Sequence, residues 1–326
     1  DKVLFEKGRV GCMEYPAYVA ALDIGGTKIA GALLRYEQID AAPEVVFETQ
    51  VPTQAQRGGG PVLVTVCDVA NTVLAEARSR REQVLGIDAA NGVLLLRVKG
   101  KGYRGVLAVG KNPAALSVET CSTYGTVGQK IGVTAEEHDG VLAMNASGFL
   151  DPGGNGNGGT VAGYAMSNGE EYGSHFTQWA YKRIELREDN RFYIKDASAP
   201  TTEGTTDATE FQPAMIIDGV KYTTDVWTDS NPRACIGQSD KYEILMLVIE
   251  GRLWLEGING TSVNTCSDIL LQHGCMQAMN LDGGSSAMMW FDGKYVMRSS
   301  SPDNRYNGGR PAPNAWVYKA AGTFEE

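Results

Sequence analysis

The stretch Ala278-Met-Asn-Leu-Asp282-Gly-Gly-Ser-Ser286 decides how most of the chain is interpreted. An apolar run typical of a strand leads through Asn280 to Asp282 and then into a turn. Glycines in such a turn let backbone N–H groups approach a ligand, and hydroxyl groups add donors. We interpret the stretch as an oxyanion or phosphate cradle beside a carboxylate, with a plain hairpin as the alternative. The cradle residues are Gly283, Gly284, Ser285 and Ser286.

Three further blocks accompany this stretch: Asn145-Ala-Ser-Gly-Phe-Leu-Asp151, Pro232-Arg233-Ala-Cys-Ile-Gly237 and Gly308-Gly-Arg310-Pro-Ala-Pro-Asn314. Together the four blocks resemble the phosphodiester glycosidase family over about residues 89–320. The resemblance implies hydrolysis of a glycosyl-1-phosphodiester, such as an N-acetylglucosamine-1-phosphodiester, or of a related cell-surface glycan. Bacterial members of this family are associated with exopolysaccharide.

The family's chemistry suggests roles for the polar residues of the blocks. Arg233 and Arg310 fit a phosphate, because a guanidinium group binds it bidentately. Asp282 is the expected acid, base or nucleophile. The expected contacts to sugar hydroxyls or phosphate are Asn145, Asn280 and Asn314.

A second carboxylate is usual in glycoside cleavage, and the sequence leaves its identity open. Glu250, Asp151 and Asp139 are the candidates. His138 and His273 lie outside the four blocks and are expected at the surface or in packing. No cofactor is indicated with certainty. A divalent cation is possible, although no EF-hand pattern is present.

The N-terminal part has a motif of its own, Asp23-Ile-Gly-Gly-Thr-Lys28. Residues 18–34 predict two strands around this turn, and apolar residues at helical spacing predict a helix over 61–81. Another strand is expected at 84–87. An anion nest in the turn would bind phosphate through these residues: Asp23, Gly25, Gly26, Thr27 and Lys28.

Residues 14–87 resemble the beginning of the ROK family of sugar kinases and repressors. That resemblance implies a partial actin-like, ribonuclease-H-like α/β lobe with a vestigial phosphate turn. The family's later catalytic and cysteine-rich motifs are missing, so we do not expect a working kinase. The predicted fold class is therefore α+β, with this lobe over 1–87 and a mixed-sheet glycosidase domain over 88–326.

Local patterns predict several elements of the larger domain. Hairpins are expected at Asp218-Gly219 and Asp292-Gly293. A helix is expected at about Thr265 to His273, with Gly274 after its end. Segment 183–213 is polar and is expected to contain a mobile loop.

Composition excludes some functions. The formal net charge of −10 argues against nucleic-acid or anionic-membrane binding. No run of about 18 apolar residues and no signal peptide are visible, so we expect no membrane span. The six cysteines form no CxxC pair, although Cys266 and Cys275 are able to pair in an oxidising compartment. The family resemblance implies an extracytoplasmic location, with a cytoplasmic one as the alternative.

The sequence is therefore compatible with three functions. A glycoside hydrolase that acts on a phosphodiester-linked sugar is the main hypothesis. A fragment of an ATP-dependent sugar kinase and a non-catalytic glycan-binding module are the alternatives.

Overall fold

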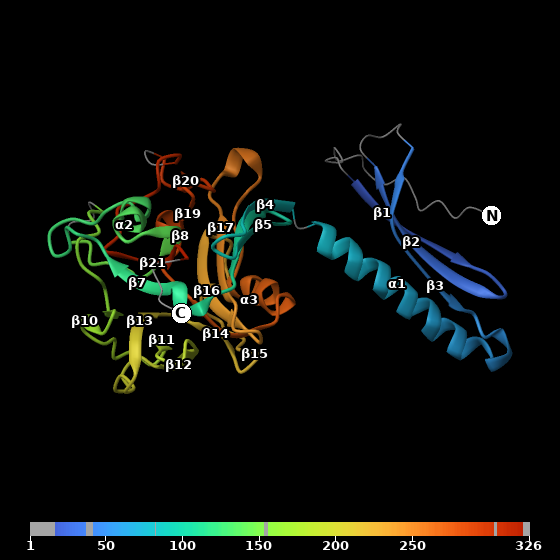
Figure 1. The fold of residues 1–326 in the computed structure, drawn as a ribbon, viewed down its shortest axis with the longest axis horizontal. Coiled ribbons are helices and arrows are strands. Elements are labelled where there is room, and N and C mark those ends of the chain that lie inside the picture. Colours follow the sequence, from blue (N-terminus) through green and yellow to red (C-terminus); the bar gives the residue numbers. More distant parts are fainter. Residues whose placement is uncertain (1–16, 37–41, 82, 153–155, 303–304, 322–326) are drawn as a thin grey trace. The chain divides into compact units, whose positions relative to one another are not determined.

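The computed structural model describes residues 17–36, 42–81, 83–152, 156–302 and 305–321. It divides into two compact units, Asp1–Glu82 and Gln83–Glu326 (Figure 1). Strands account for 44% of the structure and helices for 17%, and all strand pairings among the described residues are antiparallel. The expected α+β class is therefore wrong, because antiparallel sheets dominate the protein.

The first unit is a three-stranded sheet, in the order β1-β2-β3, with one long helix. Ile29 and Leu33 are fully buried, and Val69 and Val73 of the helix lie against the same face of the sheet. The strands and the helix predicted here are confirmed. Their bounds are β1 Ala17–Ile24, β2 Lys28–Tyr36, β3 Glu44–Pro52, the short η1 Ala55–Arg57 and α1 Gly59–Arg81.

The predicted actin-like lobe is absent. An α/β lobe requires the chain to cross over after the helix and add a parallel strand to the same sheet. Here the strand after the helix, β4 (Gln83–Asp88), instead pairs antiparallel with β5 (Val93–Gly100) of the second unit. The ROK resemblance thus extends to a hairpin, a third strand and a helix that do not form the expected lobe.

Helix α1 also corrects the expectation about membrane spans. Its segment Gly59–Ala77 has a mean hydropathy of 1.3 and, by length and composition alone, is long and apolar enough to cross a bilayer. Within the first unit, Val69 and Val73 of this segment pack against the sheet instead. One such helix is weak evidence for a membrane function.

The second unit contains three antiparallel sheets. The eight-stranded sheet, in the order β15-β14-β18-β16-β17-β6-β5-β4, adds β6 Tyr103–Gly110, β14 Ala214–Ile217, β15 Val220–Lys221, β16 Arg233–Ser239, β17 Ile244–Glu250 and β18 Cys275–Asn280. One five-stranded sheet, β20-β19-β8-β21-β7, comprises β7 Leu116–Thr120, β8 Gly140–Asn145, β19 Met289–Phe291, β20 Lys294–Tyr295 and β21 Asn314–Lys319. The other, β10-β9-β13-β11-β12, comprises β9 Tyr164–Ser167, β10 Glu170–Gly173, β11 Lys182–Arg187, β12 Phe192–Asp196 and β13 Thr205–Phe211.

Strand β17 shows why the eight-stranded sheet has two cores. Side chains alternate between the faces of a strand, and a strand covered on both faces is apolar throughout. The even-numbered residues of β17 join the core that includes β8 and β21, and the odd-numbered residues join the core under helix α3 (Val263–Gln272). The even set is Ile244, Met246 and Val248, and the odd set is Leu245, Leu247 and Ile249.

The local turn predictions for the second unit are confirmed. Asp218-Gly219 joins β14 to β15, and Asp292-Gly293 joins β19 to β20, each with two positive φ angles. Helix α3 begins two residues before the predicted start, because the Ser262 hydroxyl accepts a hydrogen bond from Thr265 N at 3.2 Å. Gly274 follows the helix with φ 72°. The remaining helical segments are η2 Pro113–Ala115, α2 Ile131–Glu137, η3 Trp254–Glu256 and η4 Gly284–Ser286.

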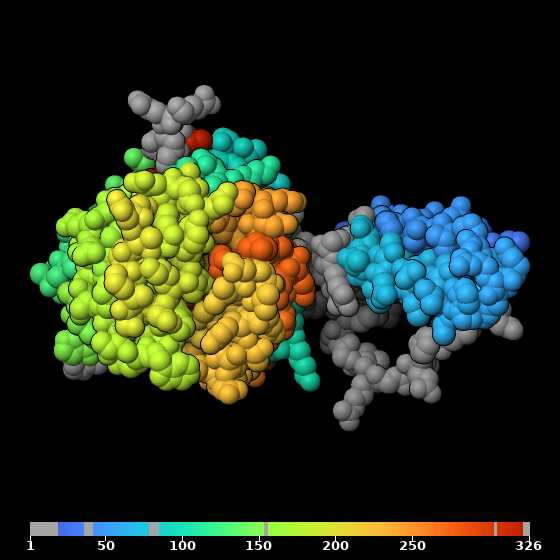
Figure 2. Space-filling model, turned by 90° about the horizontal axis from the view of Figure 1, so that it is seen from below, coloured from blue at the N-terminus to red at the C-terminus, as the bar shows by residue number. Residues whose placement is uncertain are grey.

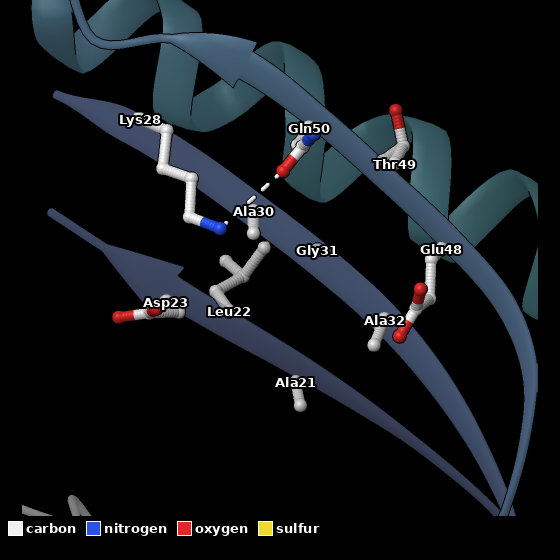
Figure 3. A pocket seen from close by; sticks show the side chains of 10 residues that line it. All are labelled: Ala21, Leu22, Asp23, Lys28, Ala30, Gly31, Ala32, Glu48, Thr49 and Gln50. Atoms are coloured by element: carbon white, nitrogen blue, oxygen red, sulfur yellow. Dashed lines mark hydrogen bonds between the residues drawn. The ribbon is translucent and has the colours of Figure 1, made fainter.

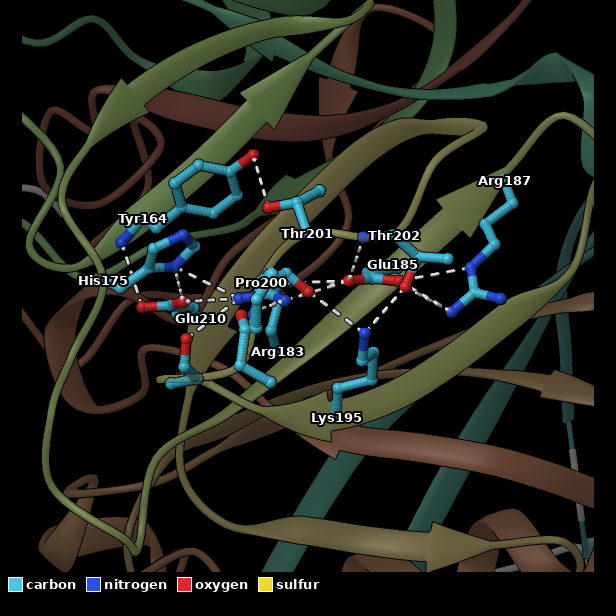
Figure 4. A network of polar contacts seen from close by, with 12 residues as sticks. Tyr164, His175, Arg183, Glu185, Arg187, Lys195, Pro200, Thr201, Thr202 and Glu210 are labelled. Atoms are coloured by element: carbon cyan, nitrogen blue, oxygen red, sulfur yellow. Dashed lines mark hydrogen bonds and ion pairs between the residues drawn. The ribbon is translucent and has the colours of Figure 1, made fainter.

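Segment 183–213 consists mainly of strands β11, β12 and β13, and its charges are paired inside the protein. Arg183, Glu185 and Glu210 are fully buried, with Arg183 3.0 Å from Glu185 and 3.3 Å from Glu210 (Figure 4). Figure 2 shows the yellow-green segment around these strands packed without a gap against the yellow and orange segments that follow it. The segment also contains a loop, residues 197–204 between β12 and β13, and its mobility stays a prediction. The mutual pairing of the charges is not visible in the sequence.

Candidate functional site

The site lies at one end of three neighbouring strands of the eight-stranded sheet, β16, β17 and β18. Strand β16 is antiparallel to both β17 and β18, so its first residues lie beside the last residues of those two strands. Arg233 begins β16, Arg252 follows β17, and Asn280 ends β18 just before Asp282. The sheet thus brings together polar residues that are up to 49 positions apart in the sequence (282 − 233).

A pocket of about 240 Å³ opens at this edge. Its polar wall contains one carboxylate and three guanidinium groups, and two aromatic side chains complete it. The lining residues are Phe211, Trp227, Asn231, Arg233, Arg252, Asn280, Leu281, Asp282, Gly283, Gly284, Ser285, Ser286 and Arg310.

Asp282 is the carboxylate of this pocket. Burial raises its pKa to about 6, because removal from water penalises the charged form more than its neighbours stabilise it. The opposing interactions come from the Ser286 hydroxyl, the charge of Arg310 and the Gly283 N–H. A carboxyl group with this pKa is able to exchange a proton near neutral pH, which suits acid–base catalysis.

Arg233 is buried, and most of its hydrogen bonds hold it in place. Its Nε donates to Thr261 O at 3.0 Å, and its Nη2 donates to the Trp227 and Asp229 carbonyls at 3.1 and 2.8 Å. Nη2 also lies 3.0 Å from the Asp229 carboxylate. Within the described part of the chain, Nη1 is the nitrogen with no acceptor at hydrogen-bond distance. The guanidinium is therefore rigid, with one nitrogen available to a ligand in the pocket.

Arg310 approaches the pocket from the loop before β21. Its Nη2 lies 3.0 Å from the Asp151 carboxylate, and its Nη1 donates to Ser285 Oγ at 3.4 Å. The guanidinium carbon also lies 4.6 Å from the centre of the Phe149 ring. These contacts orient Arg310 toward the Asp282 turn.

Arg252 was missed by the sequence analysis. Its Nε donates to Asn231 Oδ1 at 2.9 Å, and Asn231 in turn donates to Asp229, the partner of Arg233. A Cβ atom built on Gly284 would lie 3.3 Å from Arg252 Nη1, so the guanidinium lies over the glycine turn. The available signal was its position directly after the buried strand that ends at Glu250, but the strand order was needed to use it.

The three asparagines occupy different places. Asn280 lines the pocket, and its Nδ2 donates to Gln212 O at 2.7 Å. Asn145 donates to the Asp282 carbonyl at 2.7 Å and accepts from Met288 N at 3.0 Å, so both ends of its amide hold the turn. Asn314 is bonded to Ser147 through both amide atoms at 3.0 Å. The latter two support the site from behind and are not among the lining residues.

The glycine turn is packed against β16. Gly284 N donates to Pro232 O at 3.0 Å, and a Cβ atom on Gly283 would lie 2.8 Å from that same carbonyl. Gly284 has φ 58°, a conformation that favours glycine. Ser285 and Ser286 follow in η4, with both residues lining the pocket. The four cradle residues therefore do lie together beside Asp282.

The candidates for a second carboxylate are separated by the structure. Asp151 is joined to the pocket through Arg310. Glu250 is bonded to Arg104 at 2.5 Å and to Arg298 N at 2.8 Å, and neither it nor Asp139 lines the pocket. Burial raises the pKa of Glu250, while the charge of Arg104 opposes that shift.

The described histidine and cysteine side chains do not line the pocket. Among the residues that the structure describes, no group of three or more His, Cys, Asp or Glu side chains is placed to hold a metal ion. His138 pairs with Glu119 at 3.1 Å, away from the lining residues. Cys266 and Cys275 are free thiols rather than a disulfide, and Cys12 lies outside the described residues.

Asp23 and Lys28, which flank the glycine turn of the first unit, line a different pocket of about 480 Å³ on the sheet face opposite α1 (Figure 3). Asp23 and Lys28 are exposed, and Lys28 donates to Gln50 Oε1 at 3.4 Å. Gly25 N donates to Lys28 O at 2.8 Å, so this N–H closes the hairpin and is not free for an anion. Gly25, Gly26 and Thr27 are not among the residues that line the pocket. Phosphate binding by this turn therefore stays a prediction, with Gly25 N already bonded within the hairpin.

Comparison with known proteins gives one family and a consistent fold. The family model for phosphodiester glycosidases matches residues 138–319. The SPbeta prophage-derived uncharacterized protein YomE of Bacillus subtilis is 25% identical over 191 residues, which are 54% of this chain and 28% of that protein. The chain thus spans less than a third of this curated relative.

A solved structure with a similar fold is the zebrafish N-acetylglucosamine-1-phosphodiester alpha-N-acetylglucosaminidase catalytic domain, auto-inhibited by its pro-peptide. The TM-score is 0.56 at 15% identity, and the match covers 70% of this chain and 82% of that one. At this identity the likeness establishes the fold. Since the family match spans more than half of the residues, the chain belongs to the phosphodiester glycosidase family.

Proposed function

We propose that the second unit hydrolyses a glycosyl-1-phosphodiester, with N-acetylglucosamine-1-phosphodiesters as the first substrates to test. The observation that carries this proposal is one pocket that combines the carboxylate of Asp282, whose pKa is raised to about 6, with three arginines. A sugar-1-phosphodiester needs cationic groups for its phosphate and a titratable group near the anomeric carbon. The arginines are Arg233, Arg252 and Arg310.

The chemistry of the leaving group suggests the role of Asp282. When water attacks the anomeric carbon, the C1–O bond breaks and its electron pair moves to an oxygen of the departing phosphate monoester. Arginines that hold this anion stabilise it, so its departure needs no proton. Asp282 therefore acts in its ionised form, either by accepting the proton of the attacking water or by attacking C1 itself.

Substitution of Asp282 tests this role. Asp282→Asn removes the ionisable group but keeps the size of the side chain, and we expect kcat to fall by at least ~10². The matched control is Asp23→Asn, at the glycine turn of the first unit, which should leave turnover unchanged. An unchanged rate in Asp282→Asn with an intact fold would remove this residue from the mechanism.

The wild-type protein itself distinguishes an enzyme from a binding module. Binding of the diester by calorimetry without release of sugar would identify a glycan-binding module on the same fold. A natural substrate from a cell-surface glycan and an extracytoplasmic location stay predictions.

A further inference from the structure

Trp227 is the exposed aromatic wall of the pocket. Its side chain is 41% accessible to solvent although it lines a site next to the buried Arg233. The centre of its ring lies 5.7 Å from the guanidinium carbon of Arg233. A large apolar surface left open beside a cationic group is suited to stacking against a ligand that the cation also binds.

The backbone of Trp227 is fixed independently of its ring. The residue has φ 57°, which is unfavourable for a bulky side chain and occurs mainly where surrounding contacts impose it. Its carbonyl accepts hydrogen bonds from Arg233 Nη2 and from Val263 N, both at 3.1 Å. Asn264 Nδ2 holds the same loop through Thr224 O at 3.0 Å. The contacts that hold this loop are therefore made by the Trp227 carbonyl, and the ring is available to bind a ligand.

We propose that Trp227 is the specificity-determining residue for the second alcohol of the phosphodiester, the one that stays on the phosphate after cleavage. Its ligand chemistry is a ring with a flat or apolar face, such as a sugar or a nucleoside base. This inference rests on the proposed function, because it assumes that Arg233 binds the phosphate.

The arrangement of the pocket explains why the indole ring of Trp227 contacts the second alcohol rather than the sugar that is cleaved. The anomeric carbon must reach Asp282 beside the glycine turn, so the cleaved sugar occupies that part of the pocket. A phosphate bound by Arg233 would lie next to the ring of Trp227, which is the more exposed of the two residues. At about 240 Å³, the pocket is smaller than the roughly 300–1,000 Å³ of sites that enclose a drug-sized ligand. A diester with two large substituents therefore extends over the exposed wall.

Three esters of N-acetylglucosamine-α-1-phosphate test the proposal: methyl, cyclohexyl and benzyl. The ester bond remains intact during C1–O cleavage, so the three leaving groups have similar reactivity. For the wild-type protein we expect kcat/KM to be about three- to tenfold higher for a ring ester than for the methyl ester, mainly through KM. A preference for cyclohexyl indicates a sugar-like alcohol, and a preference for benzyl indicates a nucleoside base.

Variants connect the preference to the indole ring. Trp227→Ala should abolish the ring preference and change the methyl ester by less than about threefold, and Trp227→Phe should restore much of the preference. Trp179→Ala removes an 81% exposed tryptophan outside the pocket and should behave as wild type. Melting temperatures confirm that each variant is folded. A preference retained in Trp227→Ala, or an equal loss for all three esters, would overturn the proposal.

A binding experiment separates failure of the proposed hydrolysis from failure of the proposed role of Trp227. If the wild-type protein cleaves none of the esters, the proposed function fails, and calorimetric Kd values for the same esters decide the role of Trp227. Tighter binding of a ring ester that disappears in Trp227→Ala supports the role. Equal Kd values for methyl and ring esters in the wild-type protein rule it out.

Discussion

Each unit of the protein contains an aspartate at the end of a strand, followed by a double-glycine turn and a hydroxyl residue. In the first unit, Asp23 is exposed on an open sheet face, and its neighbour Lys28 is bonded to a neutral glutamine. In the second unit, Asp282 is partly buried and shares its pocket with three arginines from separate segments. The pocket of the first unit is twice as large, yet no buried charge lines it.

This difference shows that a glycine turn becomes a candidate site through the structure around it. Burial raises the pKa of Asp282, and buried contacts hold Arg233 rigid, whereas solvent screens the exposed charges at Asp23 and Lys28. The same contrast applies to stability, because the second unit also contains a buried ion network and the first unit depends on one helix packed on three strands.

The largest effect is expected in the buried network of the second unit. Arg183→Met removes the buried cation that Glu185 and Glu210 share, although Glu185 keeps Arg187 at 2.8 Å, and we expect the free energy of unfolding of this unit to fall by about 3–5 kcal/mol. The neighbouring Lys182→Met removes a cation whose partner, Asp196, is exposed, so its cost should stay below about 1 kcal/mol. Denaturant titration measures both, and equal effects would contradict a special role for burial.

A substitution in the first unit should separate the stabilities of the two units. Leu33 is fully buried against α1, so Leu33→Ala should lower the stability of the first unit by about 2–5 kcal/mol. Leu74→Ala, at a 44% exposed position of α1, should cost no more than about 0.5 kcal/mol. Calorimetry should show only the transition of the first unit moving, and a loss of hydrolysis in Leu33→Ala would show that the units are coupled.

The pH dependence of kcat/KM should report Asp282. Since its pKa is raised to about 6 and the ionised form is proposed to act, kcat/KM should rise with pH through about 6 and level off above it. About one unit below this pKa only roughly a tenth of the carboxyl is ionised, which predicts a loss of about tenfold.

A control identifies the group that titrates. Asp207 also has a pKa raised to about 6 by burial, but it lies outside the pocket, so Asp207→Asn should leave the profile unchanged. A rate that instead falls above pH 6 would assign Asp282 the role of general acid.

The smallest effect is expected from removing the first unit. A chain of residues 83–326 retains strand β4 with its partner β5 and contains all of the pocket residues. We expect it to unfold cooperatively and to keep hydrolysis within about twofold, because a unit of this length buries its own core. The separate first unit should aggregate, since among its described residues β1 and β3 are both edge strands of the sheet. Insolubility of 83–326 would show that the first unit supports its fold.

The sequence by itself determined the features that depend on near neighbours. The hairpin turns at Asp218-Gly219 and Asp292-Gly293 follow from residues that adopt positive φ, and α1 follows from apolar residues at helical spacing. The four family blocks likewise identified the glycine turn and Arg233, because each block is a continuous stretch of residues.

Only the tertiary structure decided what those pieces form. The choice of β5 as the partner of β4 excluded the expected α/β lobe, and the order β18-β16-β17 brought Arg252 beside Asp282. The burial of the charges in 183–213 was not predicted, because a charge is stable in a core only when its partner is buried with it, and the sequence does not show that pairing. Strand order and burial arise from contacts between residues far apart in the sequence, so no local pattern encodes them.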